Sequence, residues 1–143
     1  MTVKFKKLTP TARIPKYAHP TDSGMDLYSD EEIVIPAGNR ALVHTGIALA
    51  LPQNTEGQVR SKSGLALKFG LQVLNSPGTI DTNYRGEICV ILLNTSDTDY
   101  TVEVGQKIAQ LVICPFYTCK TELVDDLDAT DRGEGGFGST GLL

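Results

Sequence analysis

The stretch RSKSGLA, residues 60–66, combines groups that bind phosphate. Arg60 and Lys62 supply positive charge, Ser63 supplies a hydroxyl, and the backbone supplies its amides. Such donors at the start of a helix hold phosphates and other oxyanions. The alternative interpretation of this stretch is a helix cap that binds no ligand. For Arg60, a surface charge at the end of a strand is an equally good interpretation. The stretch is a candidate phosphate-binding segment.

Three carboxylates stand on predicted loops. Asp22 and Asp26 fall in TDSGMDLYS (21–29), and Asp81 falls in NSPGTIDTNYRGE (75–87). DSG and NSPG are also good turn sequences, so each stretch alone has a purely structural interpretation. If phosphates are bound, these carboxylates are expected near a hard cation such as Mg²⁺, which prefers oxygen ligands.

The C-terminal stretch RGEGGFGSTG holds five of the fourteen glycines of the chain. Arg132, Ser139 and Thr140 offer phosphate-binding groups in a backbone that bends freely. Phe137 and Tyr84 are aromatic residues among small or polar neighbours, where a side chain can stack on a planar base. Together the segments predict a site for a polyphosphate that bears a flat group, with Mg²⁺.

Short strands must position these segments. Apolar and β-branched residues recur in runs bounded by turn sequences such as PAGN and NTSDTD, and no stretch keeps a helical period over three turns. One short helix is expected over SGLALKFG, with Ser63 as its N-cap and Gly70 as its C-terminal stop. The pattern predicts an all-β jelly-roll β-barrel or sandwich over residues 1–127, followed by a glycine-rich arm over 128–143. The expected strands are 3–8, 40–51, 70–75, 86–94, 100–104 and 108–117.

The composition narrows the classes of partner. The chain has 143 residues, enough for one domain, and its net charge of −4 argues against binding nucleic acid through a basic face. The longest apolar run, ICVILL, is too short to span a bilayer, and no signal segment is expected at the N-terminus.

Cys89, Cys114 and Cys119 form no CxxC pair, which indicates buried thiols in a reducing cytoplasm. His19 and His44 are isolated in the sequence, so a histidine-based zinc site is not expected.

Five stretches resemble, in order and spacing, the five motifs of the trimeric dUTPase family (dUTP diphosphatases). They are PTDSGMDLYS, RSKSGLA, NSPGTIDTNYRGEI, GQKIAQL and RGEGGFGSTG, and they run from about Pro20 to Gly141. The resemblance implies a jelly-roll homotrimer with three active sites shared between subunits, in which a neighbour supplies the fifth motif as a mobile arm. It also implies hydrolysis of dUTP to dUMP and pyrophosphate with Mg²⁺ on the triphosphate. This reaction keeps uracil out of DNA and supplies dUMP for dTMP synthesis.

The same resemblance implies roles for the third motif. Asp81 corresponds to the catalytic base that activates the water attacking the α-phosphorus. Tyr84 would pack against the deoxyribose and leave no room for a 2′-hydroxyl. Asn75 and the main chain of the third-motif hairpin would read uracil, excluding thymine by a clash and cytosine by unmade hydrogen bonds. The hairpin residues implied in substrate binding are Gly78, Thr79 and Ile80.

The other four motifs are implied to bind the triphosphate and Mg²⁺. Asp26 would hold water ligands of the Mg²⁺, and Ser63 would hydrogen-bond the phosphate chain. Arg132 would reach the γ-phosphate, and Phe137 would stack on uracil. The remaining implied substrate-binding residues are Lys62, Gly64, Gln110, Gly138, Ser139 and Thr140. Position 62 most often carries arginine in the family, and lysine keeps the charge but loses the planar bidentate fork.

Two other functions compete with this interpretation. A dCTP deaminase shares the fold and the trimer, but Ile91 occupies the position where its catalytic glutamate is expected, and Glu87 lies too early in the strand. A non-catalytic jelly-roll module that binds partners is the second alternative, with SDEE (29–32) as an acidic docking patch. The function of a non-catalytic module would not require the third and fifth motifs together. Pyrophosphate release from dUTP separates the two possibilities.

Overall fold

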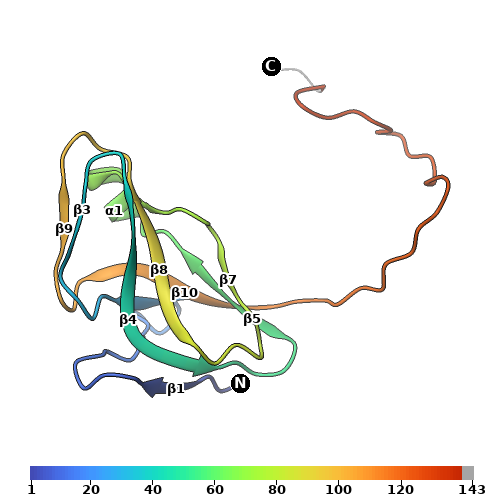
Figure 1. The fold of residues 1–143 in the computed structure, drawn as a ribbon. Coiled ribbons are helices and arrows are strands. Elements are labelled where there is room, and N and C mark those ends of the chain that lie inside the picture. The colour runs from blue at the N-terminus through green and yellow to red at the C-terminus, as the bar shows by residue number, and fades with distance from the viewer. Residues whose placement is uncertain (140–143) are drawn as a thin grey trace.

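In the computed structural model, the described residues 1–139 form a mostly β-stranded domain with one α-helix (Figure 1). The helix α1 spans Ser63–Phe69. The strands are β1 (Lys4–Lys7), β2 (Gly24–Tyr28), β3 (Ile33–Ile35), β4 (Arg40–Ala50), β5 (Thr55–Arg60), β6 (Leu71–Val73), β7 (Gly78–Ile80), β8 (Glu87–Asn94), β9 (Tyr100–Val102) and β10 (Lys107–Pro115). All six predicted strands are present within a few residues. Four short strands, β2, β3, β5 and β7, lie outside the predicted ranges.

Two four-stranded antiparallel sheets bury a common core. Their strand orders are β1-β4-β8-β6 and β2-β10-β5-β7, and β3 pairs with β9 in a small third sheet. Along β8 every second side chain is buried, which directs Ile88, Val90 and Leu92 inward. These side chains join Leu27 and Leu111 of the other sheet in one hydrophobic cluster. The predicted all-β jelly-roll fold is confirmed.

The helix α1 begins one residue earlier than predicted. Lys62 is its N-cap, with φ −89° and ψ 122° and no side-chain capping bond, so the prediction of Ser63 as N-cap is wrong. The reason is local, because the Lys62 carbonyl accepts the first helical bonds, from the amides of Leu65 and Ala66 at 3.1 and 3.0 Å. Gly70 ends the helix as predicted, with φ +65°. No helix within residues 1–139 has the length and apolar content needed to cross a lipid bilayer.

Beyond β10 the chain leaves the two sheets. Residues 116–139 run away from the sheets as an extended arm without helix or strand (Figure 1). Tyr117, Leu123 and Leu127 on this arm are almost fully exposed. Cys119 also lies here and is exposed, so the prediction of buried thiols is wrong for this cysteine. The other two cysteines, Cys89 and Cys114, are half-buried.

Candidate functional site

The carboxylate of Asp26 is buried and held by two ammonium groups. Lys62 Nζ lies 2.5 Å from its Oδ1, and Lys107 Nζ lies 2.6 Å from its Oδ2. Asp26 lies within strand β2 and not on a loop as predicted. Burial by itself raises the pKa of Asp26, but hydrogen bonds and charges from Lys107 and Lys62 outweigh burial, so the pKa is lowered. Asp26 is therefore ionised at neutral pH.

Gln110 of β10 lies beside Asp26 in the same sheet. It pairs in register with Asp26 of β2 on one side and with Arg60 of β5 on the other. Its Nε2 donates to the Ser61 carbonyl at 3.0 Å, which holds the segment entering α1. A Cβ atom at Gly24 would lie 2.6 Å from Gln110 Oε1. A larger residue at Gly24 would displace the glutamine amide.

The first, second and fourth motifs converge on a hollow of about 330 Å³. Its lining residues are Ala18, His19, Asp22, Ser23, Gly24, Asp26, Lys62, Lys107 and Gln110. The charges of its two lysines balance those of its two aspartates. An anionic ligand here would need positive charge from another source.

Lys107 is a residue that the sequence reasoning missed. It lies three positions before Gln110, and residues three apart in a regular strand point to opposite faces. A register shift between Lys107 and Ala109 changes this, and both Lys107 and Gln110 line the same hollow. The bulge itself carries no clear sequence signal, but Lys107 was the only cation of GQKIAQL.

The third motif forms a second hollow, of about 360 Å³. Asn75, Asp81 and Tyr84 line it together with Leu42, Thr79, Ile80, Glu87, Ile88, Cys89 and Ile91. Asp81 directly follows β7, and the Tyr84 amide donates to its carbonyl at 3.1 Å. The Tyr84 hydroxyl donates to the Glu87 carbonyl at 3.0 Å, and 45% of Tyr84 remains exposed. A carboxylate, an amide and an aromatic face thus share one opening.

The hairpin residues before Asp81 differ in exposure. Gly78 is buried beneath Asn75, where a Cβ atom would lie 3.2 Å from Nδ2. The Thr79 side chain is exposed, whereas Ile80 is buried. Their strand, β7, pairs with β5 at the edge of its sheet.

Within residues 1–139, the two hollows share no lining residue. The strand β5 separates β7 from β10 in the sheet. One chain therefore brings Asp26, Lys62 and Gln110 together, and it brings Asn75 and Asp81 together elsewhere. Ser63 and Gly64 lie exposed in the first turn of α1 and line neither hollow.

The described residues of the fifth motif, 132–139, line neither hollow and belong to the extended arm. Arg132 Nε donates to the Gly135 carbonyl at 2.7 Å, which closes a local turn. Phe137 is fully exposed and has φ +48°, and Gly138 has φ +91°. Ser139 is exposed as well. Thr140 lies outside the described residues.

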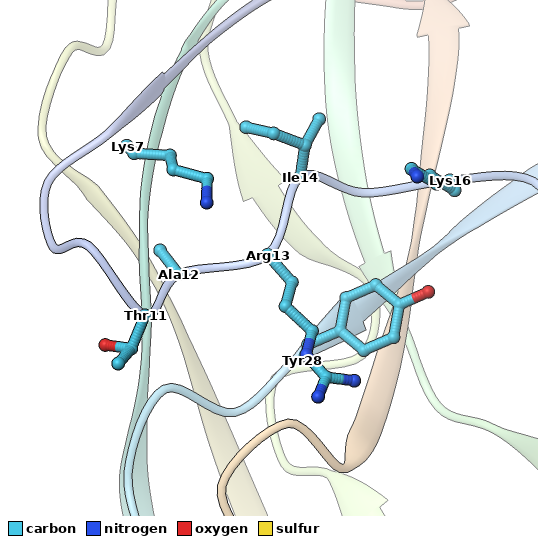
Figure 2. Close-up of a pocket in the computed structure, with 7 residues that line it drawn as sticks. All are labelled: Lys7, Thr11, Ala12, Arg13, Ile14, Lys16 and Tyr28. Atoms are coloured by element: carbon cyan, nitrogen blue, oxygen red, sulfur yellow. The ribbon is translucent and has the colours of Figure 1, made fainter.

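A third hollow, of about 450 Å³, contains none of the predicted site residues (Figure 2). The Arg13 guanidinium lies 5.7 Å from the centre of the Tyr28 ring and donates to the Gly105 carbonyl at 3.2 Å. Gly105 has φ +77°, and a Cβ atom there would lie 2.6 Å from Arg13 Cζ. Arg13 thus holds the turn in which the fourth motif begins.

Comparison with known proteins assigns the chain to a family. A sequence model of the dUTPase family matches residues 11–141. The chain belongs to the dUTPase family. A relative of this dUTPase-family chain in Clostridium tetani is named deoxyuridine 5'-triphosphate nucleotidohydrolase. It is 54% identical over 140 residues, which cover 98% of this chain and 97% of the relative. A protein of the same name in Clostridioides difficile is also 54% identical, with 98% of each chain covered.

Solved structures of phage dUTPases share the fold of this dUTPase-family chain. The dUTPase of Staphylococcus bacteriophage 80alpha with dUpNHpp matches with a TM-score of 0.92 at 30% identity, over 99% of each chain. A mutant dUTPase from phage phi11 of S. aureus matches with a TM-score of 0.81 at 27% identity, over 88% of this chain and 98% of the phage chain. That structure reveals the coordination of a structural Mg(II) ion in the phage protein.

Proposed function

We propose that the chain hydrolyses dUTP to dUMP and pyrophosphate. The observation that carries the proposal is the hollow in which Asp81, Asn75 and Tyr84 meet, because it joins a carboxylate, an amide and an aromatic face. Membership of the dUTPase family and similarity to a structure that contains dUpNHpp support dUTP as the substrate.

Asp81 is the proposed catalytic base. Its carboxylate is exposed and directly follows a strand, so it is open to solvent while its backbone is anchored. Asp81 would accept a proton from water as the oxygen of that water attacks the α-phosphorus. The bond from the α-phosphorus to the bridging oxygen would break, and pyrophosphate would leave.

The rest of the third motif would select the nucleoside. The exposed ring of Tyr84 would pack against the deoxyribose, with its hydroxyl already engaged by the Glu87 carbonyl. Asn75 and the main chain of β7 would bind the edge of uracil. Hydrogen bonds left unmade with the wrong base reject it by on the order of 10⁴-fold or more, against roughly 10–200-fold for a misplaced methylene.

The donor set fits Mg²⁺ that is held mainly by the triphosphate. Both oxygens of Asp26 are engaged by ammonium groups at 2.5 and 2.6 Å, so Asp26 would hold water ligands of the ion and not the ion itself. When bound, Mg²⁺ supplies the positive charge that the hollow around Asp26 lacks. Lys62, Ser63, Gly64 and Gln110 are the proposed phosphate contacts on this side.

We also propose that a cytoplasmic homotrimer completes each active site. The separation of the two hollows within one chain supports this assembly, and so does the fully exposed Phe137. The C-terminal segment that carries the fifth motif, predicted as residues 128–143 beyond a domain of residues 1–127, would close on the site of a neighbouring subunit. Its proposed substrate contacts are Arg132, Phe137, Gly138, Ser139 and Thr140.

Pyrophosphate release from dUTP with Mg²⁺ tests the proposal. Wild type should release pyrophosphate, and Asp81→Asn should reduce turnover by roughly 10²–10⁴-fold, the usual contribution of a general base. The exposed Asp97→Asn is a matched control that should keep wild-type turnover. UTP, dCTP and dTTP should react far more slowly than dUTP. No pyrophosphate from wild type, or full turnover in Asp81→Asn, contradicts the proposal, and dUTP formed from dCTP would indicate a deaminase instead.

A further inference from the structure

The strands β4 and β8 lie side by side (Figure 1). Their pairing places a histidine opposite a cysteine. His44 and Cys89 are direct partners in the antiparallel register, and Cys89 Sγ lies 3.5 Å from His44 Nδ1. Glu87 lies two residues before Cys89 on β8, so its side chain projects from the same face. Glu87 Oε2 lies 2.9 Å from the same Nδ1 atom. The three ligand atoms all lie within 4.8 Å of one another.

This geometry is close to that of a tetrahedral zinc site. Zinc–nitrogen bonds of about 2.0–2.1 Å and zinc–sulfur bonds of about 2.3 Å place nitrogen and sulfur ligands about 3.6 Å apart. The Nδ1–Sγ separation in the protein is 3.5 Å. Nitrogen and carboxylate ligands would be about 3.4 Å apart, so Glu87 needs to move by only about 0.5 Å from its present 2.9 Å.

Outer hydrogen bonds hold the carboxylate ligand in place. The Gly46 amide donates to Glu87 Oε1 at 2.8 Å, which leaves Oε2 directed at His44. The His44 amide donates to Glu31 Oε1 at 2.8 Å, which brings a second carboxylate beside the cluster. Partners of this kind orient metal ligands and keep a site ready for its ion.

Two carboxylates lie around this pair of strands. Glu87 Oε2 lies 2.9 Å from His44 Nδ1, and Glu31 Oε1 lies 2.8 Å from the His44 amide nitrogen. Their negative charge attracts a divalent cation, and a bound cation would stabilise the thiolate form of Cys89 as a ligand.

We propose that His44, Cys89 and Glu87 bind one thiophilic divalent cation per chain, zinc first among them, with water or Glu31 as a fourth ligand. Imidazole and thiolate together favour zinc over Mg²⁺, so this site is chemically distinct from the Mg²⁺ proposed at the triphosphate. The ion would join β4 to β8 beside the register shift between His44 and Ala48. The prediction that no histidine-based zinc site exists rested on the isolation of His44 in the sequence, and strand pairing removes that isolation.

Cobalt spectroscopy on the metal-free full-length chain tests the site. One equivalent of Co²⁺ should produce the thiolate-to-cobalt charge-transfer band and strong visible bands of a tetrahedral centre, and Zn²⁺ should abolish them. Cys89→Ser should remove the charge-transfer band and weaken binding by more than roughly 100-fold, since even an outer partner contributes about 10–100-fold. His44→Asn and Glu87→Gln should weaken binding too. One equivalent of Zn²⁺ should also raise the Tm of wild type.

Matched controls keep the test specific. His19 forms a similar pair with Asp22, at 3.2 Å between Nδ1 and Oδ2, on an exposed turn, so His19→Asn should leave the cobalt spectrum unchanged. Cys119→Ser, on the arm, should leave it unchanged as well. Circular dichroism verifies that each variant folds, and if Cys89→Ser does not, His44→Asn decides the outcome. The proposal would be overturned if wild type lacks the band, if Cys89→Ser keeps it, if His44→Asn binds Co²⁺ as tightly as wild type, or if Cys119→Ser loses the band.

Discussion

Replacing Asp26 by asparagine should destabilise the domain by about 2 kcal/mol at neutral pH. The substitution keeps the shape of the side chain but leaves two ammonium groups beside a neutral amide, at 2.5 and 2.6 Å in the present geometry. The Lys62 side chain is 28% exposed, and a hydrogen bond between charged groups in such a setting contributes roughly 1.5–3 kcal/mol. Lys107 is more exposed, so solvent screens its ion pair with Asp26. This second ion pair therefore adds little to the stability of the domain.

The effect of this substitution should shrink in acid. The folded protein lowers the pKa of Asp26 below its ordinary 3.8, so the stabilisation is fully present above about pH 4 and is lost as the pH falls through the folded pKa. Urea unfolding of wild type and Asp26→Asn, at one protein concentration, measures the difference in their free energies of unfolding at pH 7 and at pH 3. The exposed Asp97→Asn should stay within about 0.5 kcal/mol of wild type. The charge argument would be refuted if wild type and Asp26→Asn differ in free energy of unfolding by the same amount at both pH values, or if they do not differ at pH 7.

Three further outcomes are expected. Leu111→Ala removes a fully buried core side chain and should lower the free energy of unfolding by about 2–5 kcal/mol, and a urea midpoint that does not move would contradict this. A chain that ends before Arg132 should keep its far-UV circular dichroism but lose most dUTP hydrolysis, and unchanged turnover would argue against the arm. In the metal-free protein, Glu87 raises the pKa of His44 above 6.5, so the stability that wild type has over His44→Gln should be present below pH 6.5. It should then disappear as the pH rises through the raised pKa, and pH-scanned thermal unfolding checks this.

Long strands with regular alternation could be predicted from the sequence. In β8, buried and half-buried side chains alternate along the whole strand, and this period is visible in the residues themselves. The strand β2 lacks such a period because Met25, Asp26 and Leu27 are buried in succession. The strand β7 has only three residues, too few to show any period. Both lie in motifs whose glycines and polar residues favour turns.

The sequence does not show which motifs lie close together in space. Lys107 and Gln110 share a hollow because of a register shift, and His44 meets Cys89 because β4 pairs with β8. Neither relation follows from residues adjacent in the sequence. The clustering of Asn75, Asp81 and Tyr84 is easier to predict from the sequence, since a short hairpin and turn keep these residues close. Local motifs thus indicated the chemistry of each hollow, whereas the long-range strand pairing decided which residues each hollow contains.

The edge position of β7 bears on how the protein can evolve. An edge strand has main-chain N–H and C=O groups on its outer side that no neighbouring strand uses, and β7 has β5 on one side within the described sheet. If these groups read the nucleobase, the recognition pattern belongs to the backbone, which point mutations do not change. Substitutions at Thr79, whose side chain is exposed, would then alter binding strength far more readily than base preference. A change in the main-chain part of this pattern would require remodelling of the hairpin by insertion or deletion, and only the part supplied by the Asn75 amide would be open to substitution.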